Sequence, residues 1–152
     1  MNIEFVKGNI LETECDAIVN PVNCVGVAGR GLALQMKLKY PRQYEAYREL
    51  CLKKKMRPGK VFFYKEREKY IISFPTKDHW MRGTRLVYIK DGIVDLFWKL
   101  PNFPNVSSIA FPALGCGEGG LPWHVVKNEM LDSLQCRSGL KIDVKIYEPR
   151  RK

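Results

Sequence analysis

The stretch DAIVNPVNCVGVAGRGLALQMKLKYP, residues 16–41, decides the fold. Its apolar stub AIVN, residues 17–20, ends in a polar loop, which is expected of a strand covered on both faces. Behind the glycines, Leu32, Met36 and Tyr40 recur at helical spacing and predict a helix that stops at the following proline. A buried strand, a glycine-rich turn and a helix in this order are typical of α/β domains.

The rest of the chain continues this alternation of β-branched or aromatic runs with segments of helical period. Strands are predicted at residues 3–8, 60–64, 69–74, 106–111 and 141–148, and further helices around residues 44–51, 86–100 and 126–134. There is no repeat or low-complexity tract, and the length suits one domain. We therefore expect a single three-layer α/β domain over residues 1–152.

The composition indicates which classes of partner and which cell compartment suit the protein. Lys and Arg number 26 against 16 Asp and Glu, a net charge of +10, which favours a polyanionic partner such as nucleic acid or a phosphorylated ligand. A basic surface that serves only solubility is an open alternative. Five cysteines without C-x-x-C spacing predict reduced thiols and no structural zinc. The sequence has no signal-peptide core or membrane-spanning run, so a cytoplasmic protein without a membrane partner is expected.

Unusual polar and glycine-rich segments follow three of the predicted strands: NPVNCVGVAGRG at residues 20–31, PTKDHW at 75–80 and PALGCGEGG at 112–120. Ligands of open α/β sheets bind beyond these strand ends, so the three loops are expected to share one rim. Two of them lead glycines into a helix N-terminus, where free N–H groups can hold phosphate, and two such cradles suit a diphosphate. Neither has the P-loop order or the acidic residue of a dinucleotide fingerprint, which disfavours nucleoside triphosphate chemistry and hydride transfer.

These loops also carry a family resemblance. KGNI at residues 7–10, the stretch 16–41, SFPTKDHW at 73–80 and IAFPALGCGEGGLPW at 109–123 follow in this order and resemble the macrodomains, which bind ADP-ribose. The motifs N-P-V-N, G-x-G-x-A-x-x-x-K and F-P-T-K-x-H-W look most like the DNA ADP-ribosyl glycohydrolase antitoxins, relatives of the terminal ADP-ribose protein glycohydrolases. The resemblance implies a three-layer α/β/α macrodomain fold with a central mixed sheet.

The resemblance also implies an ADP-ribose site. Asn23 would contact the distal ribose, and the backbone of residues 25–31 would line the diphosphate opposite residues 114–119. Tyr147 would stack on adenine, and Asn9 stands where many macrodomains read the adenine amino group with an aspartate. The predicted ADP-ribose contacts are Asn9, Ile10, Asn23, Gly26, Val27, Gly29, Gly31, Thr76, Leu114, Gly115, Cys116, Gly117, Glu118, Gly119 and Tyr147.

The residues alone leave other interpretations open for part of this set. Asn20 and Asn23 could instead stabilise a loop through Asx turns, and an aromatic residue at the position of Tyr147 is as often part of the core.

The resemblance implies that Lys77, the lysine after F-P-T, is the catalytic residue. It would reach the anomeric carbon of the distal ribose and act there as a nucleophile or as an acid at ring opening, with no metal or other cofactor. The alternative is one more surface lysine. Asp78 and His79 would orient the site or cap the turn, whereas Trp80 and Trp123 are predicted to pack at the rim.

One position departs from the family pattern. The protein-directed relatives carry an acid in the second glycine-rich loop, and by count its place is Gly119 here, beside Glu118. Either Glu118 substitutes for that acid, or Lys77 works without one, as in the DNA-directed branch. The second alternative, like the positive net charge, favours a nucleic-acid substrate.

The expected function is hydrolysis of the bond between ADP-ribose and a nucleic-acid base, foremost thymidine in DNA. The partners would be ADP-ribosylated DNA and a cognate toxin-type ADP-ribosyltransferase whose action is reversed. Removal of ADP-ribose from protein carboxylates and a non-catalytic ADP-ribose-binding module stay open as alternatives. A generic RNA-binding domain is disfavoured, because aromatic and basic residues are not interleaved on any one predicted strand.

Overall fold

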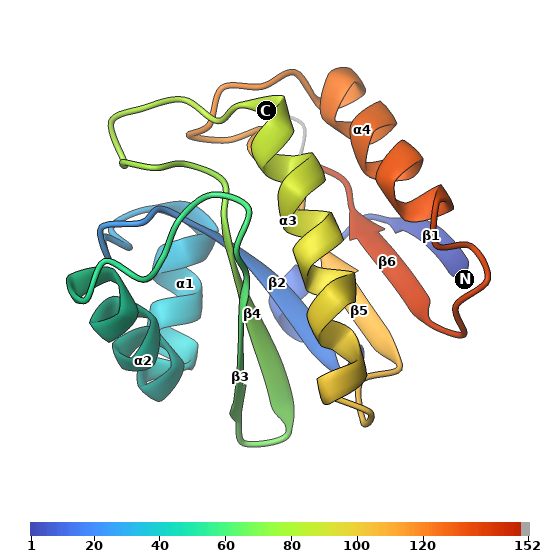
Figure 1. The fold of residues 1–152 in the computed structure, drawn as a ribbon, viewed down its shortest axis with the longest axis horizontal. Helices are drawn as coiled ribbons and strands as arrows, with labels where there is room; N and C mark the ends of the chain where they lie inside the picture. Colours follow the sequence, from blue (N-terminus) through green and yellow to red (C-terminus); the bar gives the residue numbers. More distant parts are fainter. Residues whose placement is uncertain (150–152) are drawn as a thin grey trace.

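The computed structural model describes residues 1–149 and shows a six-stranded sheet between two layers of helices (Figure 1). The strand order is β1-β6-β5-β2-β4-β3. The strands are β1 Asn2–Val6, β2 Ala17–Val22, β3 Phe62–Glu66, β4 Lys69–Pro75, β5 Ser108–Phe111 and β6 Asp143–Tyr147.

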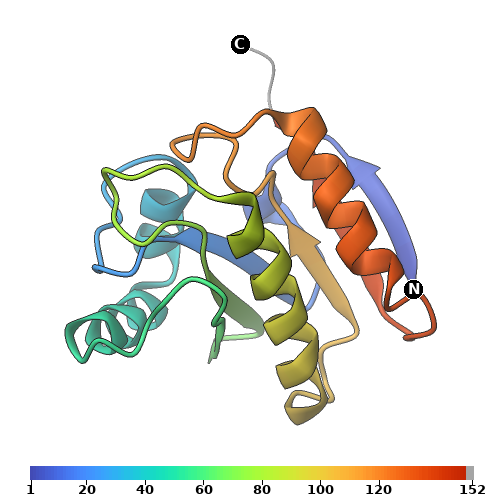
Figure 2. The same ribbon diagram turned by 45° about the horizontal axis from the view of Figure 1, so that its top comes forward.

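Two helices cover each face of the sheet, as Figures 1 and 2 show together. The helices are α1 Gly31–Lys39 and α2 Pro41–Leu52 on one face, and α3 Leu86–Lys99 and α4 Trp123–Gln135 on the other. Short 3₁₀ turns follow β1 and α3, at η1 Ile10–Glu12 and η2 Leu100–Asn102. The three-layer α/β/α prediction is therefore confirmed, and the helix predicted to stop at Pro41 ends at Lys39.

The sheet is mixed. Every strand pair is parallel except the β3–β4 hairpin, which is antiparallel. The turn of this hairpin has Arg67 in the left-handed region, with φ of 56°. Because parallel strands run the same way, the segments that follow β2, β4 and β5 leave the sheet at one edge, whereas the β3–β4 turn lies at the other (Figure 1).

The alternation of side chains along the strands divides the core between the two faces. Val19 and Phe74 face α3 and α4, whereas Ile18 and Ile71 face α1. The predicted apolar stripe of α3 is confirmed by its buried residues Ile89, Ile93, Leu96 and Phe97. The backbone of α3 approaches the sheet closely, since a Cβ atom at Gly92 would lie 2.3 Å from Cζ of Phe74.

None of the helices within residues 1–149 combines the length and the apolar character needed to cross a membrane. All five cysteines are free, as predicted: Cys15, Cys24, Cys51, Cys116 and Cys136.

Candidate active site

Three loops meet at the sheet edge where β2, β4 and β5 end, as predicted (Figure 2). We call residues 23–30 the first glycine loop, residues 76–85 the lysine loop and residues 112–122 the second glycine loop. The first leads directly into α1 and the second into α4. Within the described residues, neither helix has a side-chain hydrogen bond at its N-cap. The N–H of Val125 in α4 donates to the carbonyl of Pro122 over 3.2 Å, so the other N–H groups of the two first turns are the ones open to a ligand.

The three loops are joined in a closed ring. The backbone N–H of Cys24 donates to the carbonyl of Asp78 over 3.1 Å, which ties the first glycine loop to the lysine loop. The N–H of Thr84 donates to the carbonyl of Gly119 over 3.0 Å, which ties the lysine loop to the second glycine loop. An ion pair of 3.7 Å between Arg30 and Glu118 closes the ring between the two glycine loops.

Asn23 organises the first glycine loop. Its side-chain oxygen accepts from the N–H groups of Val25, Gly26 and Val27, and its amide donates to the carbonyl of Val27 over 2.8 Å. The side chain is 6% exposed, so the structure gives it the Asx-turn role that the residues left open. The contact between Asn23 and the distal ribose stays a prediction.

Helix α2 supports the same loop from below, a role that sequence reasoning missed. The Tyr47 hydroxyl donates to the carbonyl of Asn23 over 2.7 Å, and the Tyr44 hydroxyl donates to the carbonyl of Gly26 over 2.7 Å. The spacing of these tyrosines predicted only a helix, because the partners lie 24 and 18 residues away in sequence. Burial raises the pKa of the Tyr47 phenol, so the hydroxyl stays a donor throughout the neutral range.

Asn20 lies in β2 and not in a loop turn, so the Asx-turn interpretation is wrong for this residue. Its side chain is 5% exposed, and its Oδ1 has no hydrogen-bond partner among the described residues. A buried amide oxygen without a partner is costly to the folded state, which makes Asn20 a candidate ligand contact. Asn20 is the first residue of the N-P-V-N motif, so this motif could have indicated the candidate contact from the sequence.

The second glycine loop presents its backbone. The side chain of Leu114 is fully buried in the core beneath α3 and α4, so any contact with ADP-ribose would be made by its backbone, and that contact stays a prediction. Gly115 has φ of 73°, a value that favours glycine. Gly117 has open space where a Cβ atom would stand, so a diphosphate could approach its amide. Burial raises the pKa of the Cys116 thiol to about 11, so this thiol is neutral.

Gly119, unlike Gly117 and Gly120 of the same loop, has no space for a side chain. A Cβ atom there would lie 2.2 Å from Oγ1 of Thr84 and 2.5 Å from the carbonyl oxygen of Gly115. The acid that protein-directed relatives are expected to carry at this position therefore cannot be accommodated without a backbone shift. Glu118 beside it is exposed and paired with Arg30.

The first glycine loop also has open backbone. Gly29, and Gly31 at the start of α1, have no atom near the position of a Cβ, and Val27 is 44% exposed. Gly26 is different: its φ is 88°, and a Cβ atom would lie 3.3 Å from Cγ of Arg48. Gly26 therefore shapes the loop from the α2 side, while the exposed backbone of the other positions faces solvent.

Lys77 stands at the predicted place, directly after β4 in the ring. Its ammonium donates to the carbonyl of Trp80 over 3.3 Å, and the side chain is partly exposed. Thr76 before it is buried, and its N–H donates to the carbonyl of Val22 over 2.9 Å. The end of β4 is thereby fixed to the end of β2, which gives the lysine a rigid base. The assignment of Lys77 as the catalytic residue stays a prediction.

The neighbours of Lys77 divide into turn-forming and exposed groups. Nδ1 of His79 accepts from the N–H of Met81 over 3.1 Å, so the imidazole caps the turn, as one alternative had it. Trp123 packs against the core, in agreement with the prediction. Trp80 was expected to pack as well, which is wrong: it is 49% exposed and contacts the His79 ring, with the ring centres 5.4 Å apart.

The predicted adenine end lies where β1 and β6 end side by side. Asn9 accepts from the N–H of Leu11 over 3.0 Å and so caps η1, while Ile10 is 7% exposed. Tyr147 is partly buried and packs with Leu32 against the core below α1. These contacts fit both the core role and the stacking role of the tyrosine, and its contact with adenine stays a prediction.

Cys24 belongs to the first glycine loop and is hydrogen-bonded to the lysine loop through its backbone N–H. Burial, and then the Asp78 charge, raise the pKa of the Cys24 thiol to about 12, so it is no nucleophile near neutral pH. Within residues 1–149, no cluster of three His, Cys, Asp or Glu side chains is arranged to hold a metal ion. Metal-independent binding stays a prediction.

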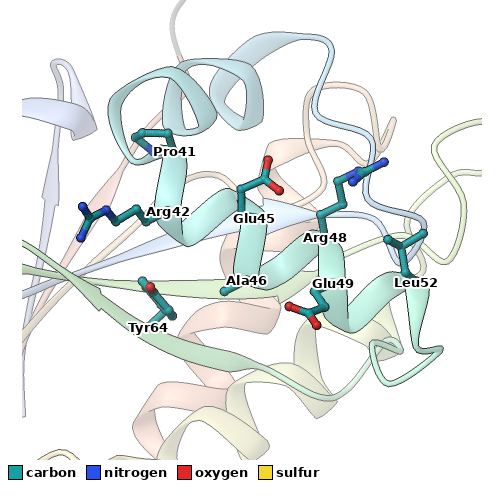
Figure 3. A pocket seen from close by; sticks show the side chains of 8 residues that line it. All are labelled: Pro41, Arg42, Glu45, Ala46, Arg48, Glu49, Leu52 and Tyr64. Atoms are coloured by element: carbon teal, nitrogen blue, oxygen red, sulfur yellow. The ribbon is translucent and has the colours of Figure 1, made fainter.

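A separate open groove of about 720 Å³ lies between α2 and β3 (Figure 3). Charged side chains of both signs line it, among them Arg42, Glu45 and Glu49, with Tyr64 opposite on β3 (Figure 3). It contains no residue of the three loops, so it is not part of the predicted ADP-ribose site.

Comparison with known proteins shows which family has this fold and these loops. A model of the Macro domain family matches residues 19–130. The macrodomain of Mycobacterium tuberculosis DarG superposes with a TM-score of 0.90 at 38% identity, over 97% of this chain and 98% of that one. A Thermus aquaticus DNA ADP-ribosyl glycohydrolase is 41% identical over 97% of this chain and 41% of its own length. Thermosipho africanus DarTG in complex with ADP-ribose has a TM-score of 0.89 at 32% identity, over 99% of this chain and 43% of that one.

The chain therefore belongs to the macrodomain family. Within this family, it is similar to the macrodomains of DarG proteins over nearly its whole length. The chain spans about two fifths of the length of the curated relatives it matches.

Proposed function

We propose that this macrodomain is an ADP-ribosyl glycohydrolase that releases ADP-ribose from nucleic acid, with thymidine in DNA as its substrate. The observation that carries the proposal is the position of Lys77, fixed at the end of β4 inside the ring of the three loops. The printed names of the relatives, DNA ADP-ribosyl glycohydrolase and DarTG in complex with ADP-ribose, support it.

The glycine loops would bind the ligand and Lys77 would perform the chemistry. The open amides around Gly29 and Gly117 would hold the diphosphate, and the N-termini of α1 and α4 would add their positive dipole ends. The distal ribose would then lie near the ammonium of Lys77. This arrangement uses backbone groups for affinity and one side chain for turnover, and it needs no metal.

Two roles of Lys77 are consistent with this arrangement. As a nucleophile, its neutral amine would form a bond to the anomeric carbon while the bond to the base breaks and the base takes up a proton. Water would then cleave the new C–N bond and release ADP-ribose. As an acid, the ammonium would protonate the ribose ring oxygen at ring opening, and water would complete the hydrolysis.

The environment of Gly119 favours DNA over protein carboxylates as the substrate. The site that carries an acid in protein-directed relatives has no space for a side chain here. The net charge of +10 also suits a phosphate backbone. The proposal includes DNA binding, a cytoplasmic location and an antitoxin role toward a DNA ADP-ribosyltransferase, and co-expression with such a transferase would test this last part through cell survival.

The substrate is tested by parallel assays on an ADP-ribosylated single-stranded oligonucleotide and an ADP-ribosylated glutamate peptide, with Lys77→Ala as the inactive reference. We expect faster release from the oligonucleotide, and slower release from the same sequence in a duplex, because the base must leave its stack. Oligonucleotide turnover at low substrate should fall steeply as salt rises. The logarithm of its rate against the logarithm of the salt concentration should have a slope of about −0.7 per phosphate contact. Release from the peptide should be nearly independent of salt. Equally fast release from both substrates, with neither rate depending on salt, would favour the protein-directed alternative. Binding without turnover would favour a non-catalytic module.

A further inference from the structure

The indole of Trp80 is held in the open beside Lys77. The carbonyl of Trp80 accepts from the Lys77 ammonium over 3.3 Å, so the two residues belong to the same turn. The His79 ring stacks on the indole at an interplanar angle of 29°, and the imidazole is itself fixed by the N–H of Met81. With 49% of its surface exposed, Trp80 is supported on one side and open to solvent beyond it.

The segment around this indole is basic as well as aromatic. Arg82 is 75% exposed in its side chain and lies 3.8 Å from the carboxylate of Asp78. Arg85 lies over the Tyr88 ring, with its guanidinium carbon 5.8 Å from the ring centre. Exposed cations interleaved with an exposed aromatic ring are typical of surfaces that bind single-stranded nucleic acid, in which the rings stack on bases and the cations follow the backbone.

A second exposed tryptophan shows that exposure alone does not define such a surface. Trp98 is 80% exposed, but it lies near the last turn of α3, at the sheet edge away from the loops (Figure 1). Its exposed neighbour one turn earlier is the apolar Val94. Trp80, in contrast, shares its loop with Lys77, Arg82 and Arg85.

Resting on the proposed function, we propose that Trp80 is a stacking platform for the nucleobase next to the modified base of single-stranded DNA, with Arg82 and Arg85 contacting the adjoining phosphates. Successive bases of one strand are about 3.4 Å apart when stacked, so a base flanking the one at Lys77 is within reach of the same turn. A flanking base held on the indole would keep the modified base out of its stack and in the cleft. An ADP-ribosylated carboxylate offers no base to this platform.

The test compares kcat/KM for two substrates: a short single-stranded oligonucleotide ADP-ribosylated at one thymidine, and ADP-ribosylated thymidine mononucleoside. Trp80→Ala should raise KM for the oligonucleotide by about tenfold or more, and by far less for the mononucleoside, because only the oligonucleotide has a flanking base. Trp80→Phe, which keeps an aromatic ring, should have a KM for the oligonucleotide close to that of the wild type. Trp98→Ala, the matched control, should change neither substrate.

An oligonucleotide with abasic sites on both sides of the modified thymidine gives the complementary change. Wild-type protein should process it with the raised KM of Trp80→Ala, and Trp80→Ala should show little additional loss, because ring and base belong to one contact. Equal losses of Trp80→Ala on the oligonucleotide and the mononucleoside would overturn the platform and make Trp80 a support of Lys77. The platform would also be overturned if the increase in KM caused by Trp80→Ala and the increase caused by the abasic sites were additive.

A readout without turnover separates this inference from the proposed function. Unmodified single-stranded oligonucleotide should quench the tryptophan fluorescence of the wild-type protein and of Trp98→Ala, and this quenching should be lost in Trp80→Ala. If the wild-type protein released no ADP-ribose from any oligonucleotide, the proposed function would fail, while the quenching would still decide the platform. Quenching that persists in Trp80→Ala contradicts the stacking contact.

Discussion

Thr84 and Gly119 interlock the lysine loop and the second glycine loop. The N–H of Thr84 donates to the carbonyl of Gly119 over 3.0 Å, and the threonine hydroxyl lies 2.2 Å from where a Cβ atom at position 119 would stand. A real Cβ atom could not stand so close to a hydroxyl oxygen, and Thr84 has little room to move because it is itself buried. The close packing at this point fixes the second glycine loop, which forms one side of the proposed diphosphate site, against the lysine loop.

A Gly119→Ala substitution should therefore destabilise the fold. We expect the free energy of unfolding in urea to fall by about 1–3 kcal/mol, as for other overpacked sites, and the affinity for ADP-ribose to fall with it. Gly117→Ala is the matched control in the same loop, because a Cβ atom there meets no neighbour. Its free energy of unfolding should stay within about 0.5 kcal/mol of the wild type. Equal stability of the two variants would show that the loop adapts freely.

The ion pair between Arg30 and Glu118 should restrain ligand binding more than it stabilises the fold. Both side chains are largely exposed, at 79% and 62%, so removal of the pair should hardly change the melting temperature. Glu118→Gln should tighten ADP-ribose binding severalfold in calorimetry, because a carboxylate that repels the diphosphate is lost and Arg30 is released.

Glu45→Gln, in the groove beside α2, removes the same charge away from the loops and should leave the affinity unchanged. The turnover of Glu118→Gln decides whether this residue substitutes for the missing acid. A loss of more than about tenfold would assign it that role. Turnover close to that of the wild type would mean that Lys77 works without an acid.

Lys77→Ala should separate affinity from turnover. A residue that acts on the anomeric carbon contributes mainly in the transition state, so ADP-ribose affinity should change by a small factor while turnover falls on the order of a hundredfold or more. Calorimetry and single-turnover release from a modified oligonucleotide measure the two quantities. Parallel losses in both would make Lys77 a phosphate ligand.

Tyr47→Phe should weaken the first glycine loop. The substitution removes the donor to Asn23 and leaves a buried carbonyl without a partner, which should lower the free energy of unfolding by about 1–3 kcal/mol. ADP-ribose affinity should also fall, since the loop amides lose their fixed arrangement. Tyr64→Phe removes a hydroxyl from the groove on the far side of α2 and should change neither quantity. A Tyr47→Phe variant with wild-type affinity would show that the loop is ordered without α2.

Periodicity predicted most of the fold because the pattern of burial is local. Ile89, Ile93 and Leu96 are all fully buried on one face of α3, as their helical spacing indicates. The turn chemistry at the strand ends likewise predicted where the three loops lie. The connections between β2, β4 and β5 bring the chain back to the same end of the sheet before each of these strands begins. The three strands therefore run in the same direction, and β2 pairs in parallel with both β4 and β5.

The contacts that build the site could not be predicted in this way. The support of Asn23 by Tyr47, and the pairing of Arg30 with Glu118, join residues that are distant in sequence and whose local patterns predict only helix or loop. The burial of the Leu114 side chain could not be predicted from its place in a glycine-rich loop, since burial depends on which elements cover it. Composition could not distinguish the exposed Trp80 from the packed Trp123, since burial depends on which neighbours cover a ring.

The β3–β4 hairpin gives the molecule a handle away from its ligand edge. Its turn lies at the opposite end of the sheet from the loops (Figure 1), and Glu66 just before it is anchored to the backbone N–H of Gln43 over 2.7 Å. An insertion between Arg67 and Glu68 would leave that anchor and the strand pairing intact. A peptide tag or biotin acceptor placed there would immobilise the protein with the edge proposed to bind ADP-ribose facing the solution, as a capture reagent of defined orientation.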